Sequence, residues 1–84
     1  MTSKAASSFW RRYEGLPAEI RRLADRNYGV WLENQRHPSL RFKPFRAGQW
    51  SVRVGDHYRA VGYFPDNQTF VWTWIGTHEE YNKL

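Results

Sequence analysis

The chain has 84 residues, a formal net charge of +5 and no cysteine. This length allows one domain, residues 1–84, with a modest core, and the lack of cysteine excludes disulfides and thiolate metal sites. No apolar run is long enough to span a membrane and no segment resembles a signal peptide, so we expect a cytoplasmic protein. Five residues each of Phe, Tyr and Trp supply most of the area for a core.

The chain is predicted to begin with a helix. Residues 7–14 carry Phe9 and Tyr13 at helical spacing, and Gly15 is well placed to end this helix. The residues before it show no alternation of apolar and polar side chains. We therefore expect residues 1–7 to be flexible and the sheet to lack a strand there.

A second helix is predicted from Ala18 onward, because a single apolar stripe runs along this segment. The stripe consists of Ile20, Leu23, Ala24, Trp31 and Leu32. His37 and Pro38 are expected to end the helix, since the residue before a proline disfavours helical backbone. A very short turn joins the two helices, so they should lie antiparallel as a hairpin.

Beyond the helices the apolar residues alternate with a period of two, which is typical of strands. Residues 40–45 predict a short strand that Pro44 confines to a sheet edge. Further strands are predicted at 50–54, 58–64 and 69–75. The predicted fold class is α+β, with an N-terminal two-helix hairpin packed on a three- to four-stranded antiparallel sheet.

The hairpin between the two middle strands has one favoured register, because its apolar residues must share a face. That register pairs Val54 with Tyr58, Arg53 with Arg59, Val52 with Ala60 and Trp50 with Gly62. If the alternation continues into the last strand, Trp72 lies opposite Gly62 and Trp74 lies opposite Ala60. Both large rings would then pack on the helix side.

This register makes Arg53 and Arg59 direct neighbours on the face without helices, where like charges cost up to ~1 kcal/mol. An anion between them would turn this cost into stabilisation. The alternative is that each arginine pairs with an acid, and Asp56 is near enough to pair with one of them.

The location of the charge favours the anion. Residues 36–59 hold six basic residues and one acidic residue, whereas the rest of the chain holds seven of each. Arginine binds phosphate bidentately, so the cluster indicates a phosphate or nucleic-acid site, with a solvated basic face as the alternative. The further residues expected to contact phosphate or RNA are Arg41, Lys43, Arg46 and His57. A solvated loop position is the alternative for the histidine.

The C-terminal residues 78–83 predict a short helical turn that places His78 and Tyr81 on one face. His78 could serve as a general base or acid, and Tyr81 could transfer protons or stack on a nucleobase. Glu79 and Glu80 are alternative candidates for the general base of the reaction. The structural alternative is that His78 and the glutamates begin a helix and that Tyr81 folds back on the sheet.

Four segments of the chain resemble the RelE/ParE superfamily of toxins from bacterial type II toxin–antitoxin systems. They read LPAEIRRLA, HPSLRFKPF, WSVRVGDHYRAVGY and VWTWIGTHEEYNKL. The resemblance implies a RelE-like fold, a cognate antitoxin and, in the RelE branch, cleavage of mRNA on the ribosome. The residues that match the catalytic positions of that branch are Arg53, Arg59, Tyr81 and His78. Family members usually begin with a β-strand, and this sequence departs from the family there.

We therefore predict a metal-independent, ribosome-dependent mRNA endoribonuclease that inhibits translation and needs no cofactor. Its expected partners are the antitoxin, mRNA and the ribosome. The three histidines do not have metal-ligand spacing. One alternative is a non-catalytic ParE-like inhibitor of DNA gyrase, and another is a degenerate toxin that only binds its antitoxin. The oligomeric state stays open.

Overall fold

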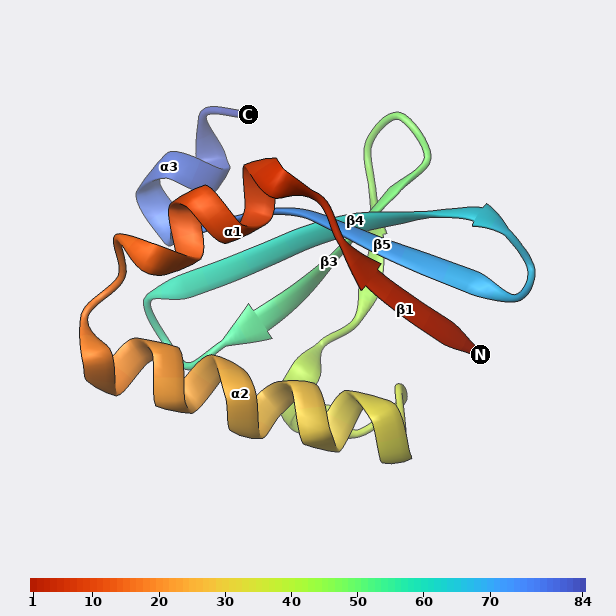
Figure 1. The fold of residues 1–84 in the computed structure, drawn as a ribbon, viewed down its shortest axis with the longest axis horizontal. Coiled ribbons are helices and arrows are strands. Elements are labelled where there is room, and N and C mark those ends of the chain that lie inside the picture. Colours follow the sequence, from red (N-terminus) through yellow and green to blue (C-terminus); the bar gives the residue numbers. More distant parts are fainter.

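The computed structural model describes residues 1–84 and contains one five-stranded sheet with helices packed against it (Figure 1). In chain order the elements are β1 (Thr2–Ala5), α1 (Ser7–Glu14), α2 (Ala18–Glu33), the 3-10 helix η1 (Pro38–Leu40), β2 (Lys43–Phe45), β3 (Gln49–Val54), β4 (Tyr58–Asp66), β5 (Thr69–Thr77) and α3 (His78–Asn82). The strand order is β1-β5-β4-β3-β2. Strand β1 runs parallel to β5, and the other neighbouring strands are antiparallel.

The predicted α+β class is confirmed, but the sheet has five strands and one parallel pair, whereas three to four antiparallel strands are predicted from the sequence. Helices α1 and α2 run in opposite directions past the sheet, and the short connection after Gly15 joins them (Figure 1). Helix α2 ends at Glu33, before the predicted stop, and Pro38 instead begins η1. No helix is long and apolar enough to cross a membrane.

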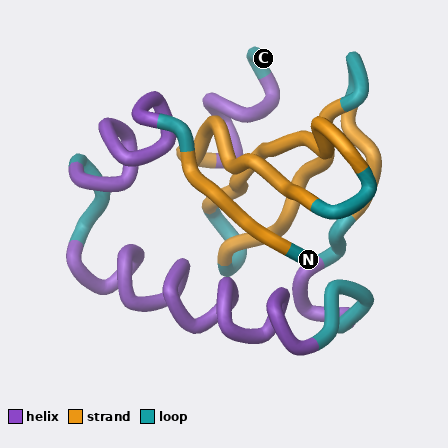
Figure 2. Tube along the Cα trace, turned by 45° about the vertical axis from the view of Figure 1, so that its right-hand side comes forward, coloured by secondary structure: helices purple, strands orange, loops and turns teal.

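The first strand corrects the expectation for the N-terminus. Residues 2–5 were expected to be flexible and outside the sheet, yet they form β1 at its edge (Figure 2). The Thr2 N–H donates to the Gln68 carbonyl at 2.7 Å, and the Ala6 N–H donates to the Trp72 carbonyl at 2.9 Å. Backbone pairing with β5 therefore defines this strand, whose sequence TSKA shows no apolar alternation.

The register of the central hairpin is as predicted, including the pairs Arg53 with Arg59 and Trp50 with Gly62. The tight loop requires Gly55, which has a φ of +64° and whose Cβ position would lie 2.6 Å from Leu23 of α2. The hairpin is thus fitted against the second helix.

The predicted position of Trp74 is wrong. A bulge between Val61 and Gly62 leaves Trp72 opposite Gly62 as expected but pairs Trp74 with Val61. Because one extra residue reverses the alternation, Trp74 lies on the face away from α2, and Ile75 takes the place opposite Ala60.

The edge near β2 is also shorter than predicted. Only Lys43–Phe45 pair with β3, whereas Leu40 belongs to η1 and is fully buried. Arg41 follows in left-handed backbone with a φ of 47°, which separates η1 from the strand. Pro44 lies on the edge strand, as expected.

The core is built from aromatic rings on the helix side of the sheet. Trp31 of α2 packs on Phe70 and Trp72 of β5, with ring centroids 5.3 and 5.2 Å away. Leu32 is 55% exposed and does not join this core, so the predicted apolar stripe is wrong at that residue. Trp31 occupies the buried side of this helical turn instead.

Candidate phosphate-binding site

The open face is defined here as the face of the sheet that carries Ser51, Arg53 and Arg59. It lies opposite α2, because these residues alternate along β3 and β4 with the core residues Val52 and Ala60. Helix α3 follows directly from β5 and brings Tyr81 onto this face.

Arg53 and Arg59 meet at the hairpin loop. The Nε of Arg53 donates to the Gly55 carbonyl at 3.1 Å, and a terminal nitrogen of Arg59 lies 3.4 Å from the same oxygen. Arg59 also donates to the Tyr58 carbonyl at 2.7 Å. The two guanidinium groups therefore share one acceptor, and the predicted proximity of the two arginines is confirmed.

The two arginines differ in how they are neutralised. Arg53 forms an ion pair with Asp56, whose side chain is 75% exposed. No carboxylate lies within ion-pair distance of Arg59. The alternative of internal neutralisation thus describes Arg53 but not Arg59, and the pair keeps an excess of positive charge.

The pKa of Arg59 shows the same imbalance. It is lowered from its ordinary value, first because of burial and then because of the positive charge of Arg53. Arg41 lowers it further, whereas Tyr81 and Asp56 act in the opposite direction. A bound anion would relieve the repulsion that Arg59 experiences.

Tyr81 folds back on the open face. Its ring stacks on Phe45 with centroids 4.7 Å apart, and its hydroxyl donates to the buried Ser51 Oγ at 3.1 Å. This position matches the structural alternative for Tyr81. It also keeps the ring close enough to Arg59 to influence the pKa of that arginine.

His78 begins α3 and is exposed to solvent. Its backbone N–H donates to the His57 carbonyl at 2.7 Å, so α3 starts against the end of the loop between β3 and β4. The His78 and Tyr81 ring centroids lie 6.1 Å apart, as expected for residues on one face of a turn.

Glu80 has a structural position. It forms a capping box with Thr77, and its carboxylate accepts a hydrogen bond from Arg12 of α1 at 2.9 Å. Arg12 also donates to the Ile75 carbonyl at 2.7 Å and lies over the Trp74 ring. Glu80, considered above as a base, therefore anchors α3 to α1, while Glu79 is exposed.

The remaining predicted phosphate contacts surround this centre. Lys43 pairs with Ser51 and therefore lies on the open face, and Arg41 acts on the charge of Arg59. Arg46 lies in the turn after β2, over the Phe45 ring. His57 is exposed in the hairpin loop. The geometry brings the four predicted catalytic residues to one region with basic residues around them.

Four residues of this region were not predicted from the sequence: Arg12, Phe45, Ser51 and Trp74. Arg12 comes from α1, and no spacing links it to α3. Regular alternation predicts the other face for Trp74, and the bulge in the pairing of β4 with β5 reverses it. The TxxE spacing of Thr77 and Glu80 is the one signal that could have identified the cap of α3.

The anchoring role of Glu80 predicts a response to acid. Its pKa lies below the usual 4.5, because the Thr77 N–H and then the Arg12 side chain hydrogen-bond its charged form. This stabilisation is present above pH 4.5 and is lost as the pH falls through the lower folded-state pKa. We expect the Tyr81 ring resonances to shift in NMR spectra as α3 loosens at low pH.

Two variants control this acid titration. Glu80→Gln should loosen α3 already at neutral pH and remove its acid response. Glu79→Gln, which changes the same charge on the same turn, should keep the wild-type response. Equal titration of α3 in all three proteins would show that Glu80 does not hold the helix.

Several solved structures have a similar fold. The YoeB/ParE toxin from Agrobacterium tumefaciens superimposes with a TM-score of 0.72 at 19% identity, covering 93% of this chain and 99% of that one. The Methanococcus jannaschii RelB–RelE complex contains a chain with a TM-score of 0.73 at 15% identity, covering 94% of each chain. A chain of the Mycobacterium tuberculosis RelBE2 toxin–antitoxin complex superimposes with a TM-score of 0.66 at 26% identity, covering 92% of this chain and 90% of that one.

These similarities show that the chain has the RelE-like α+β fold. A family model described as the ParE-like toxin domain matches residues 18–83. The chain therefore belongs to the ParE-like toxin family. It is a toxin of the type found in RelE/ParE toxin–antitoxin systems. No curated protein sequence matches it.

Proposed function

We propose that this toxin is a metal-independent endoribonuclease that cuts mRNA on the ribosome and thereby inhibits translation. The observation that carries the proposal is the pair Arg53 and Arg59, which converge on one carbonyl while only one of them has a carboxylate partner. Two guanidinium groups in this arrangement fit the oxygens of a phosphodiester. Their charge would be most useful where negative charge accumulates during cleavage.

Cleavage without a metal requires a base, an acid and positive charge. The base removes the proton of the ribose 2′-hydroxyl, whose oxygen then attacks phosphorus. The bond from phosphorus to the 5′-oxygen breaks, and the acid protonates the departing oxygen, which leaves a cyclic phosphate. In this proposal Arg53 and Arg59 bind the crowded phosphorane, and His78 and Tyr81 transfer the protons.

Tyr81 can adopt this role only if its hydroxyl leaves Ser51, to which it donates in the free protein. A phosphate that binds between Tyr81 and Arg59 would offer a charged acceptor in place of the neutral Ser51 hydroxyl. A hydrogen bond to a charged acceptor is stronger than one to a hydroxyl. Substrate binding would therefore favour the exchange.

An antitoxin is the second proposed partner. The similar folds include chains from the Mycobacterium tuberculosis RelBE2 and Methanococcus jannaschii RelB–RelE complexes. By this similarity we propose that a cognate antitoxin binds and silences the present toxin in the cytoplasm.

A non-catalytic inhibitor of DNA gyrase is the rival function. It is favoured by the ParE-like family match, by the Asp56 partner of Arg53 and by the engagement of Tyr81 with Ser51. Induced expression separates the two functions. The nuclease gives new 5′ ends within mRNA when these are mapped by primer extension, whereas the gyrase inhibitor gives DNA damage with intact mRNA. If induced expression causes neither mRNA cleavage nor DNA damage, the remaining function is that of a degenerate toxin that only binds its antitoxin.

Tyr81→Phe is expected to reduce mRNA cleavage by about 100-fold or more if the hydroxyl transfers a proton. The change also removes the hydrogen bond to Ser51, worth about 1 kcal/mol of stability. Ser51→Ala removes the same hydrogen bond but keeps the hydroxyl of Tyr81. It should therefore retain cleavage, and an equal loss in both variants would assign Tyr81 a structural role.

A further inference from the structure

Helix α1 covers the part of the sheet edge that β1 leaves open. Strand β1 pairs with β5 only as far as Trp72. Beyond that residue, Ser8 of α1 donates to the Thr73 carbonyl at 2.8 Å. One turn later, the Nε of Arg12 donates to the Ile75 carbonyl at 2.7 Å. The spacing fits, because four helical residues rise about 6 Å and two strand residues extend about 6.7 Å.

Arg12 also contacts two residues beyond this edge. One of its terminal nitrogens lies 2.9 Å from the Glu80 carboxylate, and its guanidinium carbon lies 4.9 Å from the centroid of the Trp74 ring. These groups close over Gly76. A Cβ on this glycine would lie 2.6 Å from the Trp74 ring and 2.8 Å from both Arg12 and Glu80. One guanidinium group therefore joins the sheet edge, the first turn of α3 and Trp74.

The two side chains that Arg12 contacts adjoin Tyr81. Glu80 precedes Tyr81 in α3, and the ring centroids of Trp74 and Tyr81 lie 6.5 Å apart. Helix α3 has only five residues, which is too short for its own backbone hydrogen bonds to keep it formed. Its contacts with α1 and the sheet therefore determine where the Tyr81 hydroxyl lies relative to Arg59.

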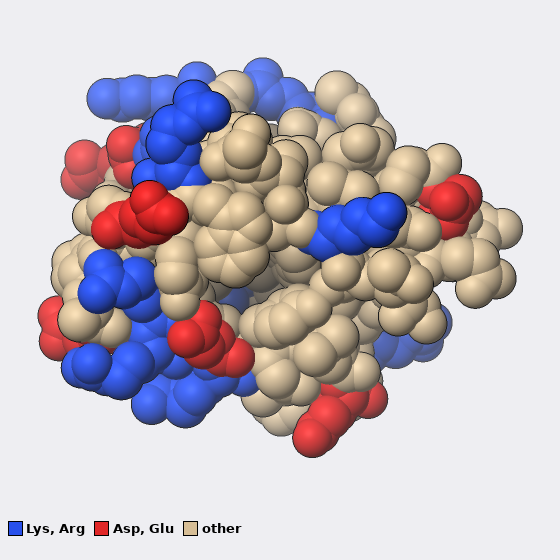
Figure 3. All heavy atoms as spheres, in the orientation of Figure 1, with Lys and Arg blue, Asp and Glu red and all other residues tan.

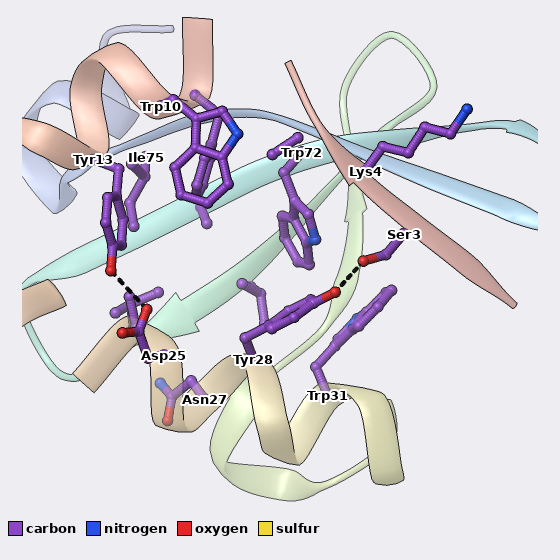
Figure 4. Close-up of a pocket in the computed structure, with 16 residues that line it drawn as sticks. Ser3, Lys4, Trp10, Tyr13, Asp25, Asn27, Tyr28, Trp31, Trp72 and Ile75 are labelled. Atoms are coloured by element: carbon purple, nitrogen blue, oxygen red, sulfur yellow. Dashed lines mark hydrogen bonds between the residues drawn. The ribbon is translucent and has the colours of Figure 1, made fainter. Parts of the chain in front are cut away.

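Helix α1 is itself fixed on its other side. Tyr13 follows Arg12 in the chain and donates to Asp25 of α2 at 2.8 Å (Figure 4). Phe9 and Tyr13 also pack against the hydrophobic core. Two neighbouring residues of α1 thus bind α2 and α3, so α1 is a fixed support for α3.

A direct contact between Arg12 and RNA is the alternative role. The end of the molecule at which α1, α3 and the start of α2 lie carries both acidic and basic side chains (left in Figures 1 and 3). Arg12 is neutralised by Glu80, whereas Arg59 has no carboxylate partner. Because phosphate binding requires uncompensated positive charge, these observations favour a role of Arg12 within the protein.

We propose that Arg12 is a positioning residue of the nuclease site, an inference that rests on the proposed function. It holds α3 through Glu80 while the Tyr81 hydroxyl exchanges Ser51 for the phosphate. The rate of cleavage then depends on Arg12, but the binding of mRNA does not, because the contacts of Arg12 are within the protein. A misplacement of about 1 Å can cost roughly 100-fold in rate.

Arg12→Ala should lower the kcat of mRNA cleavage on purified ribosomes by about 10- to 100-fold and change KM by less than about twofold. Arg11→Ala removes the same charge from the exposed neighbouring position and should keep the wild-type kcat. Ser8→Ala removes the other hydrogen bond from α1 to the edge of β5 and should keep it too. Arg12→Lys retains the charge beside Glu80 but not the planar fork, so its kcat should be intermediate.

NMR spectra report the position of α3 independently of cleavage. The nuclear Overhauser contacts between the rings of Tyr81 and Phe45, whose centroids lie 4.7 Å apart, should weaken in Arg12→Ala. Those between Trp31 and Phe70 in the core should remain, which shows that the variant is folded. If the core contacts are lost as well, Arg12→Lys carries the same kinetic and NMR test.

The double variant Arg12→Ala with Glu80→Gln tests whether Arg12 acts through Glu80. It should cleave no more slowly than Arg12→Ala alone, because the two residues act through one contact. Losses that multiply would overturn the proposal. So would a wild-type kcat or unchanged Tyr81 contacts in Arg12→Ala, or a raised KM with kcat unchanged, which would assign Arg12 to RNA binding. A wild-type toxin that leaves mRNA intact would instead contradict the proposed function, and the Tyr81 contacts would still show whether Arg12 holds α3.

Discussion

Arg59→Ala is expected to abolish the growth arrest and mRNA cleavage that wild-type expression causes. Arg59 is the arginine of the pair without a carboxylate partner, so its charge is the one most available to a phosphorane. Losing a positioned donor of this kind typically removes about 3–4 kcal/mol of transition-state stabilisation, which is roughly 100- to 1000-fold in rate. Cleavage is measured by primer extension on a reporter mRNA after induction.

Arg22→Ala is the matched control, because it removes the same charge from an exposed position on α2. It should remain toxic. Arg59→Lys keeps the charge but loses the planar fork, so it should fall between wild type and Arg59→Ala. If Arg59→Ala remains as toxic as wild type, Arg59 has no part in the mechanism.

Gly62→Ala is expected to cost about 3 kcal/mol of the free energy of unfolding. A methyl group on Gly62 would lie 2.4 Å from the Phe70 ring and 2.5 Å from the Val71 carbonyl oxygen. The backbone oxygen cannot move aside without breaking the pairing of β4 with β5 at the bulge. The loss is large because small domains are stable by only about 5–15 kcal/mol. Urea unfolding followed by tryptophan fluorescence measures it.

Gly29→Ala is the matched control, in which the same methyl group is added at an open position. No atom lies within 4 Å of its Cβ position, and the residue is exposed in α2. The change should stabilise the protein by about 0.5–1 kcal/mol, because alanine loses less conformational freedom in a helix. Similar stability changes in both variants would show that the contact with Phe70 does not constrain Gly62.

The arginine pair could be predicted from the sequence because alternation along β3 and β4 allows only one register. A shift by one residue would bury Arg53 and Arg59 and expose Val52 and Ala60, at a cost far above that of like-charge repulsion. The local alternation of residues and the burial of the apolar ones therefore favour the same register. The sequence also predicts that Lys43 lies on the neighbouring strand, and in the structure its side chain is on the same face as the two arginines.

The partners of the site residues could not be predicted in this way. Arg12 reaches Glu80 from α1, and Tyr81 reaches Ser51 from α3, so each contact joins segments far apart in the chain. Periodicity shows which face a residue occupies on its own element, but it contains no information on which remote side chain meets it.

The amino-acid sequence by itself determined the two helices, the central hairpin and the position of the positive charge, because each follows from spacing within a single segment. Only the tertiary structure decided that Thr2–Ala5 join the sheet, that Trp74 changes face and that Tyr81 rests on Ser51. These features arise from backbone pairing, from one extra residue in a strand and from remote side-chain contacts. Their free energy is gained only when distant parts of the chain pack together.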